Sequence, residues 1–158
     1  MSLEVFRAQL QLAAYVAQSN TADITHEESL LRVLGDDGSS MNWVLGHVVA
    51  IRSRLLPALG QEPVWSSEQQ RPYTRGSAPG PDIYPFHEIR IAFDESQKRF
   101  LAGLESLTPQ KLAAPMPGPN GEPAPLANLI ATIVVHDSYH LGQTGILRRL
   151  AGKPGAVK

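Results

Sequence analysis

The sequence has no cysteine among its 158 residues. This absence excludes a disulfide framework and a thiolate metal site, so any transition metal would be held by imidazole and oxygen ligands. An excess of charge of one sign is also missing, since the chain has 14 basic and 15 acidic residues and neither kind is concentrated in one stretch. Nothing in this pattern is typical of a nucleic-acid-binding surface, and no polyanionic partner is expected.

Long apolar runs are absent as well. No run approaches the roughly 20 residues that a membrane span requires. Residues 1–7, MSLEVFR, lack the apolar region of a signal peptide. We therefore expect a cytoplasmic protein with no membrane partner. Because 42% of the residues are hydrophobic, the chain can fill one core, and we expect a single domain over residues 1–158.

Four segments carry apolar residues at alternating steps of three and four, which is the spacing of one buried helical face. They predict helices over residues 3–17, 40–58, 86–107 and 126–151. Ser39 or Ser40 can cap the second helix, and Gly152, followed by Pro154, can end the fourth.

Segments rich in proline and glycine separate these helices. Residues 60–82 hold too many helix breakers for a regular element but are long enough to cross a bundle, so we expect a crossover loop that shapes a pocket mouth. Residues 35–39 and 115–125 are expected to be turns, and Pro109 to cap or restart a helix. We find no strand-like alternation and no internal repeat. The expected fold is all-α, a four-helix bundle with a long crossover loop between helices two and three.

Two histidines and a glutamine interrupt the apolar face of the fourth predicted helix. The line expected to face the core is Leu129, Ile133, His136, His140, Gln143, Leu147 and Leu150. Because residues four apart lie one above the other on a helix, the rings of His136 and His140 can reach a common point beside it. A metal ion fits that geometry, although a pair at this spacing is by itself only a moderate signal.

A third histidine, His47, occupies an apolar position of the second predicted helix. Burying an unpaired polar ring there would cost about 1–3 kcal/mol. The sequence therefore predicts that His47, His136 and His140 bind one divalent metal ion. The alternative is that backbone carbonyls, serines or buried waters satisfy each ring without a metal. Gln143 is a candidate for cofactor binding, completing the metal shell or holding a water, with a hydrogen bond to a neighbouring helix as the other interpretation.

Other polar residues are expected to play smaller parts. His26 and His87 lie beside glutamates and are expected at the solvated surface. Asp137 points away from the face shared by the two ligands on its helix, so we expect it to be exposed, with an acceptor role behind a ligand as the alternative. Trp43 is expected in the core or at a dimer contact rather than as a stacking surface.

Arg148 and Arg149 lie in the last turn of the fourth predicted helix. We expect them to favour the negative end of its dipole, with binding of a substrate carboxylate as the alternative. A general base is not evident from the residues. Glu88, Asp94 and Glu95 fall in the first turns of the third predicted helix, but the pattern does not fix which of them faces a cavity.

Three segments carry a resemblance to a known family. They are residues 41–49, MNWVLGHVV, residues 136–143, HDSYHLGQ, and residues 147–155, LRRLAGKPG. In this order they resemble the DinB-like superfamily, while the rest of the chain matches it only in general character. The resemblance implies a four-helix bundle with a long crossover, a nickel or zinc ion on three histidines that map onto His47, His136 and His140, and a homodimer.

Members of this superfamily include enzymes that use low-molecular-weight thiols, such as mycothiol-dependent isomerases and bacillithiol or glutathione transferases, beside members with no known reaction. Three neutral imidazoles leave a divalent ion its full charge and an open position, which lowers the pKa of a bound water or thiol. The leading hypothesis is therefore a metal-dependent transferase or hydrolase that activates a low-molecular-weight thiol or water against a small-molecule substrate. The alternative is a non-catalytic helical module that acts through a partner surface.

Overall fold

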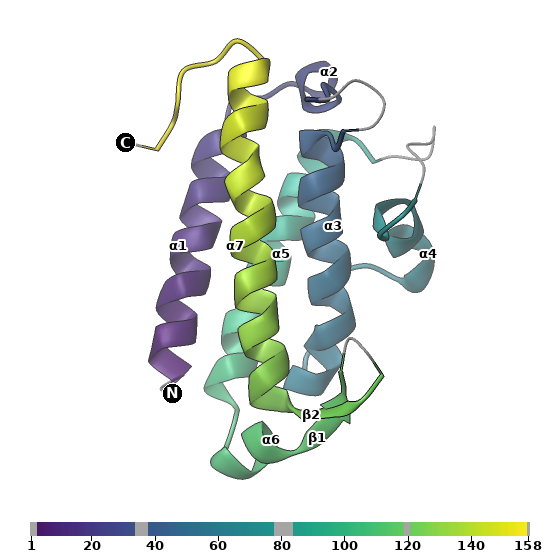
Figure 1. Cartoon of the computed structure of the whole chain (residues 1–158), viewed down its shortest axis with the longest axis vertical. Helices are drawn as coiled ribbons and strands as arrows, with labels where there is room; N and C mark the ends of the chain where they lie inside the picture. The colour runs from purple at the N-terminus through teal and green to yellow at the C-terminus, as the bar shows by residue number, and fades with distance from the viewer. Residues whose placement is uncertain (1–2, 34–37, 78–83, 119–120, 158) are drawn as a thin grey trace.

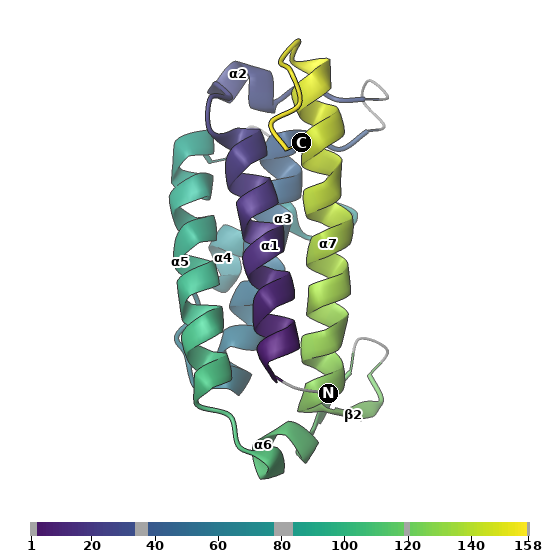
Figure 2. The same cartoon turned by 90° about the vertical axis from the view of Figure 1, so that its left-hand side faces the viewer.

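A computed structural model describes residues 3–33, 38–77, 84–118 and 121–157 of the chain. The protein is mostly helical, and four long helices lie side by side (Figure 1). These are α1 (Leu3–Thr21), α3 (Met41–Leu55), α5 (Phe86–Glu105) and α7 (Leu126–Leu150). Helix α1 packs mainly on α7 and α5, and α3 packs mainly on α5 and α7, so the four helices enclose a common interior (Figure 2). In the described part of the chain, no helix has the length and apolar character of a membrane span.

Short elements connect the long helices. They are α2 (His26–Ser29), the 3-10 helix η2 (Leu56–Leu59), α4 (Ser67–Gln70), the 3-10 helix η3 (Arg71–Tyr73), α6 (Pro109–Ala113), β1 (Pro115–Pro117) and β2 (Pro123–Pro125). The Ser40 side chain accepts a hydrogen bond from the backbone N–H of Trp43 and so caps α3, as one of the two predicted serines. Pro109 restarts the chain as a helix, also as predicted.

Helix boundaries differ from the predicted ones at two ends. Helix α1 continues to Thr21 rather than stopping near residue 17. Helix α3 ends at Leu55 instead of residue 58 and passes into the 3-10 helix η2. The cause of the early end is Pro57, which lacks a backbone N–H and whose ring crowds the preceding helical turn.

Two connecting segments contain more regular structure than predicted. The described part of the expected crossover, residues 60–77, includes α4, where Ser66 and Gln69 form a reciprocal capping box. Residues 115–125 include an antiparallel pair, β1 and β2, so the expectation of a turn without strands was wrong. Each strand has three residues, which is too short for an alternating pattern to be recognised in a sequence. Residues 35–37 of the other expected turn and 78–82 of the crossover lie outside the described residues.

Buried side chains form two clusters along the helices. The apolar cluster lies towards the start of α1 and the β1–β2 end and includes Phe6, Leu10, Leu56, Phe100 and Ile130. The site-side cluster lies towards the α2 end and includes Val44, Val48, Tyr73, Phe93 and Leu141. Charged and polar side chains are buried beside the second cluster, and that is where the histidines lie.

The buried face of α7 differs from the predicted one. Its buried residues are Leu126, Ile130, Ile133, Val134, Asp137, Leu141, Thr144, Leu147 and Arg148. Leu150, expected in the core, is 44% exposed, and His136 and His140 are half-buried. Because α7 packs on both α1 and α3, its buried face is turned between them. The two histidines therefore lie at the edge of that face, where a cavity can reach them.

Candidate metal centre

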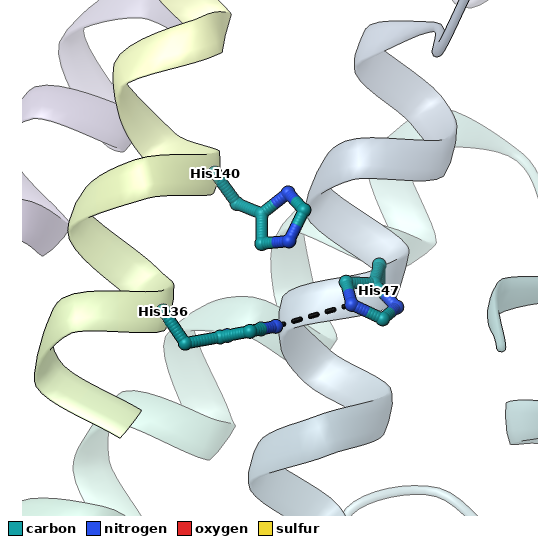
Figure 3. Close-up of side chains that lie close together, drawn as sticks. All are labelled: His47, His136 and His140. Atoms are coloured by element: carbon teal, nitrogen blue, oxygen red, sulfur yellow. Dashed lines mark hydrogen bonds between the residues drawn. The ribbon is translucent and has the colours of Figure 1, made fainter. Parts of the chain in front are cut away.

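The three predicted histidines come together between α3 and α7. His47 projects from α3, while His136 and His140 project from successive turns of α7, and the three rings point toward one another (Figure 3). One ligand nitrogen from each ring lies within 4.8 Å of the other two. The Nε2 atoms of His47 and His136 are 3.1 Å apart.

Each ring has an oxygen acceptor beside its outer nitrogen. The Nδ1 atom of His47 lies 2.7 Å from the backbone carbonyl oxygen of Tyr73. The Nδ1 atom of His136 lies 3.2 Å from Oδ1 of Asp137, and that of His140 lies 3.3 Å from Oε1 of Gln143. A carbonyl, a carboxylate and an amide oxygen accept hydrogen bonds and have no proton to give. Each Nδ1 therefore carries the hydrogen, and each Nε2 keeps a lone pair.

These tautomers make a metal ion a good fit. With hydrogen on all three Nδ1 atoms, the facing Nε2 atoms of His47 and His136 have two lone pairs and no hydrogen between them at 3.1 Å. Two such nitrogens need a positive charge between them, supplied either by a proton on one Nε2 atom, which then donates the hydrogen bond drawn in Figure 3, or by a metal ion among the three rings. Neutral imidazoles with their outer nitrogens held by oxygen acceptors form the usual histidine arrangement of metal sites. The three residues could therefore hold a metal ion, and zinc, nickel, copper and iron all suit such donors.

The surroundings lower the pKa of two of the rings, His47 and His140. Burial lowers the pKa of His47, and the neighbouring His136 and Arg54 lower it further, against the opposing effect of the Tyr73 carbonyl. Burial, followed by the proximity of His136 and His47, lowers the pKa of His140 to about 4. Near neutral pH both side chains are therefore available as metal ligands without first losing a proton.

Trp43 lies at this centre, beside the ring of His47. Its ring stacks on that of His47, with 4.7 Å between centroids and planes 8° apart. The indole Nε1–H donates a hydrogen bond to Oγ of Ser77 at 3.1 Å, which fixes the ring. Trp43 also packs against the site-side cluster, which agrees with its expected place in the core. Because one helical turn separates Trp43 from His47, the same i, i+4 rule that paired the histidines could have suggested the stacking.

Asp137 is completely buried, so its expected exposure was also wrong. Its Oδ2 atom accepts a hydrogen bond from Nε of Arg52 at 2.7 Å, and both side chains are 0% exposed. Arg52 also donates to Oγ of Ser96 at 3.2 Å and lies over the ring of Phe93. Asp137 therefore joins His136 to a buried cation on α3, which is the alternative role of an acceptor behind a ligand. An arginine in the apolar stretch that follows His47 was the signal in the sequence.

Gly46 and Tyr73 position His47, and the sequence analysis did not identify either. A Cβ atom at Gly46 would lie 2.3 Å from Cδ1 of Tyr73, so only glycine lets this ring pack on α3. Tyr73 is 0% exposed, and its hydroxyl donates to Asn42 and accepts from the backbone N–H of Tyr84. Burial raises the pKa of this phenol to about 12, which keeps it protonated. The packed ring places the Tyr73 carbonyl against His47.

An open cavity of about 890 Å³ lies beside the three histidines. On the side of the rings towards the end of α3 and the start of α7, its walls are apolar side chains, namely Ile51, Leu55, Leu129 and Ile133. Its charged lining residues are Arg54 and Arg75, and the described lining includes no aspartate or glutamate.

The three carboxylates considered as general bases lie elsewhere. Asp94 accepts a hydrogen bond from Gln18, Glu95 pairs with Arg99, and Glu88 is exposed. None of them lines the cavity. These three residues of α5 are therefore not placed to act as a general base at the histidines.

The remaining candidates also lie away from the centre. His87 is exposed, as expected, but His26 is partly buried, and its Nδ1 atom accepts a hydrogen bond from the backbone N–H of Phe86. Arg148 is buried rather than facing solvent at the helix end, and it pairs with Asp23. Arg149 is exposed. The two arginines at the end of α7 do not line the cavity.

Comparison with known families agrees with the motifs that carry the histidines. The family model described as the DinB superfamily matches residues 9–144, a span that includes all three of them. No curated protein matches the chain.

Proposed function

The chain belongs to the DinB superfamily, and on this premise we propose that it is a metal-dependent enzyme in which a low-molecular-weight thiol or water attacks a small molecule. His47, His136 and His140 would hold the ion, with nickel and zinc as the candidates that the family suggests. The observation that carries the proposal is the convergence of one nitrogen from each of three imidazole rings beside an open cavity. Gln143 would orient His140 and face the bound cofactor, since it also lines the cavity.

The chain's own residues supply positioning rather than acid–base chemistry. A divalent ion, when bound, supplies Lewis acidity that lowers the pKa of a nucleophile placed on it. The acceptors at Tyr73, Asp137 and Gln143 hold the three Nε2 atoms in place for it. A thiol has an ordinary pKa near 8.5 and needs less help to lose its proton than water does. Because the described cavity lining carries no carboxylate base, we favour a thiol transferase over a hydrolase.

Metal content and a spectroscopic titration test the proposal. Gently purified protein should contain about one divalent ion per chain, and His136→Ala should lose it, whereas the exposed-site control His87→Ala should keep it. Cobalt- or nickel-loaded protein should change its absorption spectrum when glutathione, bacillithiol or mycothiol is added. A metal-loaded protein that responds to none of these thiols would redirect the proposal to hydrolysis. Equal metal content in both histidine variants would refute the metal centre.

A second candidate function is a non-catalytic helical module that works through a partner surface. The observation that favours it is an exposed stripe on α7, where Val135, Tyr139, Ile146 and Leu150 are 69%, 66%, 62% and 44% exposed. Gly142 lies within this stripe. The same stripe supports the proposal of a homodimer, because apolar residues at this spacing can pack against a second copy of α7. Sedimentation equilibrium of the wild type and of Ile146→Asp distinguishes a dimer from a monomer.

We further propose that α1, α3, α5 and α7 act as one four-helix bundle and one domain, with residues 60–82 as its crossover. The pairwise packing of the long helices supports this arrangement. A single cooperative unfolding transition, seen alike by circular dichroism and by tryptophan fluorescence, is the expected result. Separate transitions for the two signals would argue for independent units.

A further inference from the structure

The charges that line the cavity indicate what kind of molecule it accepts. Its charged lining residues in the described chain are two arginines, Arg54 and Arg75. Arg54 lines the same cavity as His47, one of the three histidines. A cation at that centre would add to the same positive field, and a positively charged cleft attracts anions.

Arg54 is held in a position suited to an anchor. Its Nε atom donates a hydrogen bond to Oε1 of Gln70 at 3.0 Å. Gln70 is itself buried, at 7% exposure, and its Nε2 atom donates to the carbonyl oxygen of Trp65 at 2.9 Å. Within the described chain, the two terminal nitrogens of Arg54 make no hydrogen bond or ion pair. A guanidinium fixed at Nε therefore presents its other donors to the cavity.

Arg75 adds a second charge from a different element. It follows η3 in the segment between Tyr73, whose carbonyl meets His47, and Ser77, whose hydroxyl meets Trp43. Its side chain has no hydrogen bond or ion pair to the residues that the structure describes. Thus neither lining arginine has an acidic partner among the described residues, whereas other arginines, such as Arg52, Arg99 and Arg148, are paired with carboxylates.

The helices also determine how the cavity is laid out. His47, Ile51 and Arg54 follow one another along one face of α3, and Arg54 lies two turns, roughly 10 Å, beyond His47. On the facing helix α7, His136, Ile133 and Leu129 run in the same direction, since the two helices are antiparallel (Figure 1). Apolar walls therefore separate the histidine centre from the arginine.

We propose that the cavity binds a small organic anion, with its carboxylate or phosphate on Arg54, its apolar middle between α3 and α7, and its reacting end at the three histidines. Arg75 attracts the same anion from the cavity rim. This inference rests on the proposed function, because it names the substrate class of the same centre.

Calorimetric titration of the zinc-loaded full chain with three matched probes tests the inference. The probes are hexanoate, hexyl phosphate and the uncharged hexanamide. We expect either anion to bind at least 10-fold more tightly than the amide, and the tighter of the two identifies the acidic group. Arg54→Gln should weaken binding of that anion about 10- to 100-fold, as expected for a charge-assisted hydrogen bond. Arg75→Gln should weaken it less, and amide binding should not change in either variant.

Controls separate this inference from the proposal beneath it. Arg71→Gln, at an exposed arginine of the same segment outside the cavity, should bind the anion as the wild type does. Zinc content is measured in every variant, and a normal content in Arg54→Gln shows that the metal centre is intact. Equal anion binding by Arg54→Gln and the wild type, or no preference for anions over the amide, would overturn the inference while leaving metal binding standing. Absence of zinc from the wild type would instead count against the proposed function.

Discussion

The two ends of the helical interior differ in kind. In the apolar cluster, hydrophobic side chains such as Phe100 and Ile130 are fully buried against one another. Beside the site-side cluster, the same helices bury Arg52, Asp137 and His47. Apolar burial stabilises a fold without requiring particular partners, whereas each buried polar group costs free energy unless its partner is present. One end of this interior therefore stabilises the fold, whereas at the other end part of the folding free energy is lost in burying the polar groups that hold the histidines.

The largest expected effect comes from breaking the buried ion pair at the polar end. Asp137→Ala should lower the free energy of unfolding by about 3–5 kcal/mol, because Arg52 is left as an unpaired buried charge. It should also weaken metal binding about 10- to 100-fold, because His136 loses the acceptor at its Nδ1 atom. Urea denaturation and competitive zinc titration measure the two quantities. Unchanged zinc affinity would mean that Asp137 serves the fold alone.

A matched loss at the apolar end should affect stability only. Phe100 is 0% exposed, and Phe100→Ala should cost about 3–5 kcal/mol by removing buried apolar area and leaving a cavity. The zinc affinity of the fraction that remains folded should equal that of the wild type. If both variants weaken zinc binding equally, the division between the two ends does not hold.

Metal removal should destabilise the protein by acting at the polar end. A ligand that binds the native state at 100 times its dissociation constant stabilises it by about 2.7 kcal/mol. Chelation should therefore lower the melting temperature of the wild type, since the three histidines join α3 to α7. The melting temperature of His136→Ala should not respond to a chelator. Identical melting curves with and without chelator in the wild type would show that the ion is not coupled to folding.

Gly46 offers a smaller and more local test. Gly46→Ala would force the Tyr73 ring away from α3 and should cost about 1–3 kcal/mol as overpacking. Zinc affinity should fall with it, because the Tyr73 carbonyl would no longer meet His47. Gly145→Ala is the matched control on α7, since a Cβ atom there meets only Nδ2 of Asn20, at an ordinary contact distance of 3.7 Å. That change should stabilise the protein by about 0.5–1 kcal/mol and leave zinc affinity unchanged.

The smallest effect concerns acid stability at the C-terminal end of α7. The hydrogen bond from Arg148 lowers the pKa of Asp23 to about 2 from its ordinary value of 3.8. Because the folded-state pKa is depressed, this interaction stabilises the protein above about pH 4 and is lost as the pH falls towards 2. Over that window the wild type should therefore lose more stability than Asp23→Asn does. Parallel pH profiles from thermal unfolding would contradict the assignment.

The sequence predicted the elements that depend on local spacing. The i, i+4 pair of His136 and His140, the position of His47 on another helix, and the cap at Ser40 all follow from helical geometry and backbone hydrogen bonding. The structure brings those three histidines within reach of one ion.

The sequence did not predict features that depend on how helices turn against each other. The buried face of α7 includes Asp137, Thr144 and Arg148. Because the prediction took apolar residues as the mark of a buried face, it placed that face elsewhere on the helix. The burial of these polar residues depends on partners from other elements, such as Arg52 and Asp23. The acceptor for His47 is the backbone carbonyl of Tyr73, in a distant segment. Every residue has a backbone carbonyl, so the sequence does not show which one will meet the histidine.

The different acceptors behind the three rings make the histidines chemically unequal. His136 faces an anionic oxygen, whereas His47 and His140 face neutral ones. A carboxylate increases the electron density that an imidazole offers to a cation more than a neutral oxygen does. Three unequal donors would thus hold an ion in this centre, with His140 the weakest, because its acceptor is a half-buried amide at 3.3 Å. His140, the ring that would hold an ion least firmly, lines the open cavity together with Gln143.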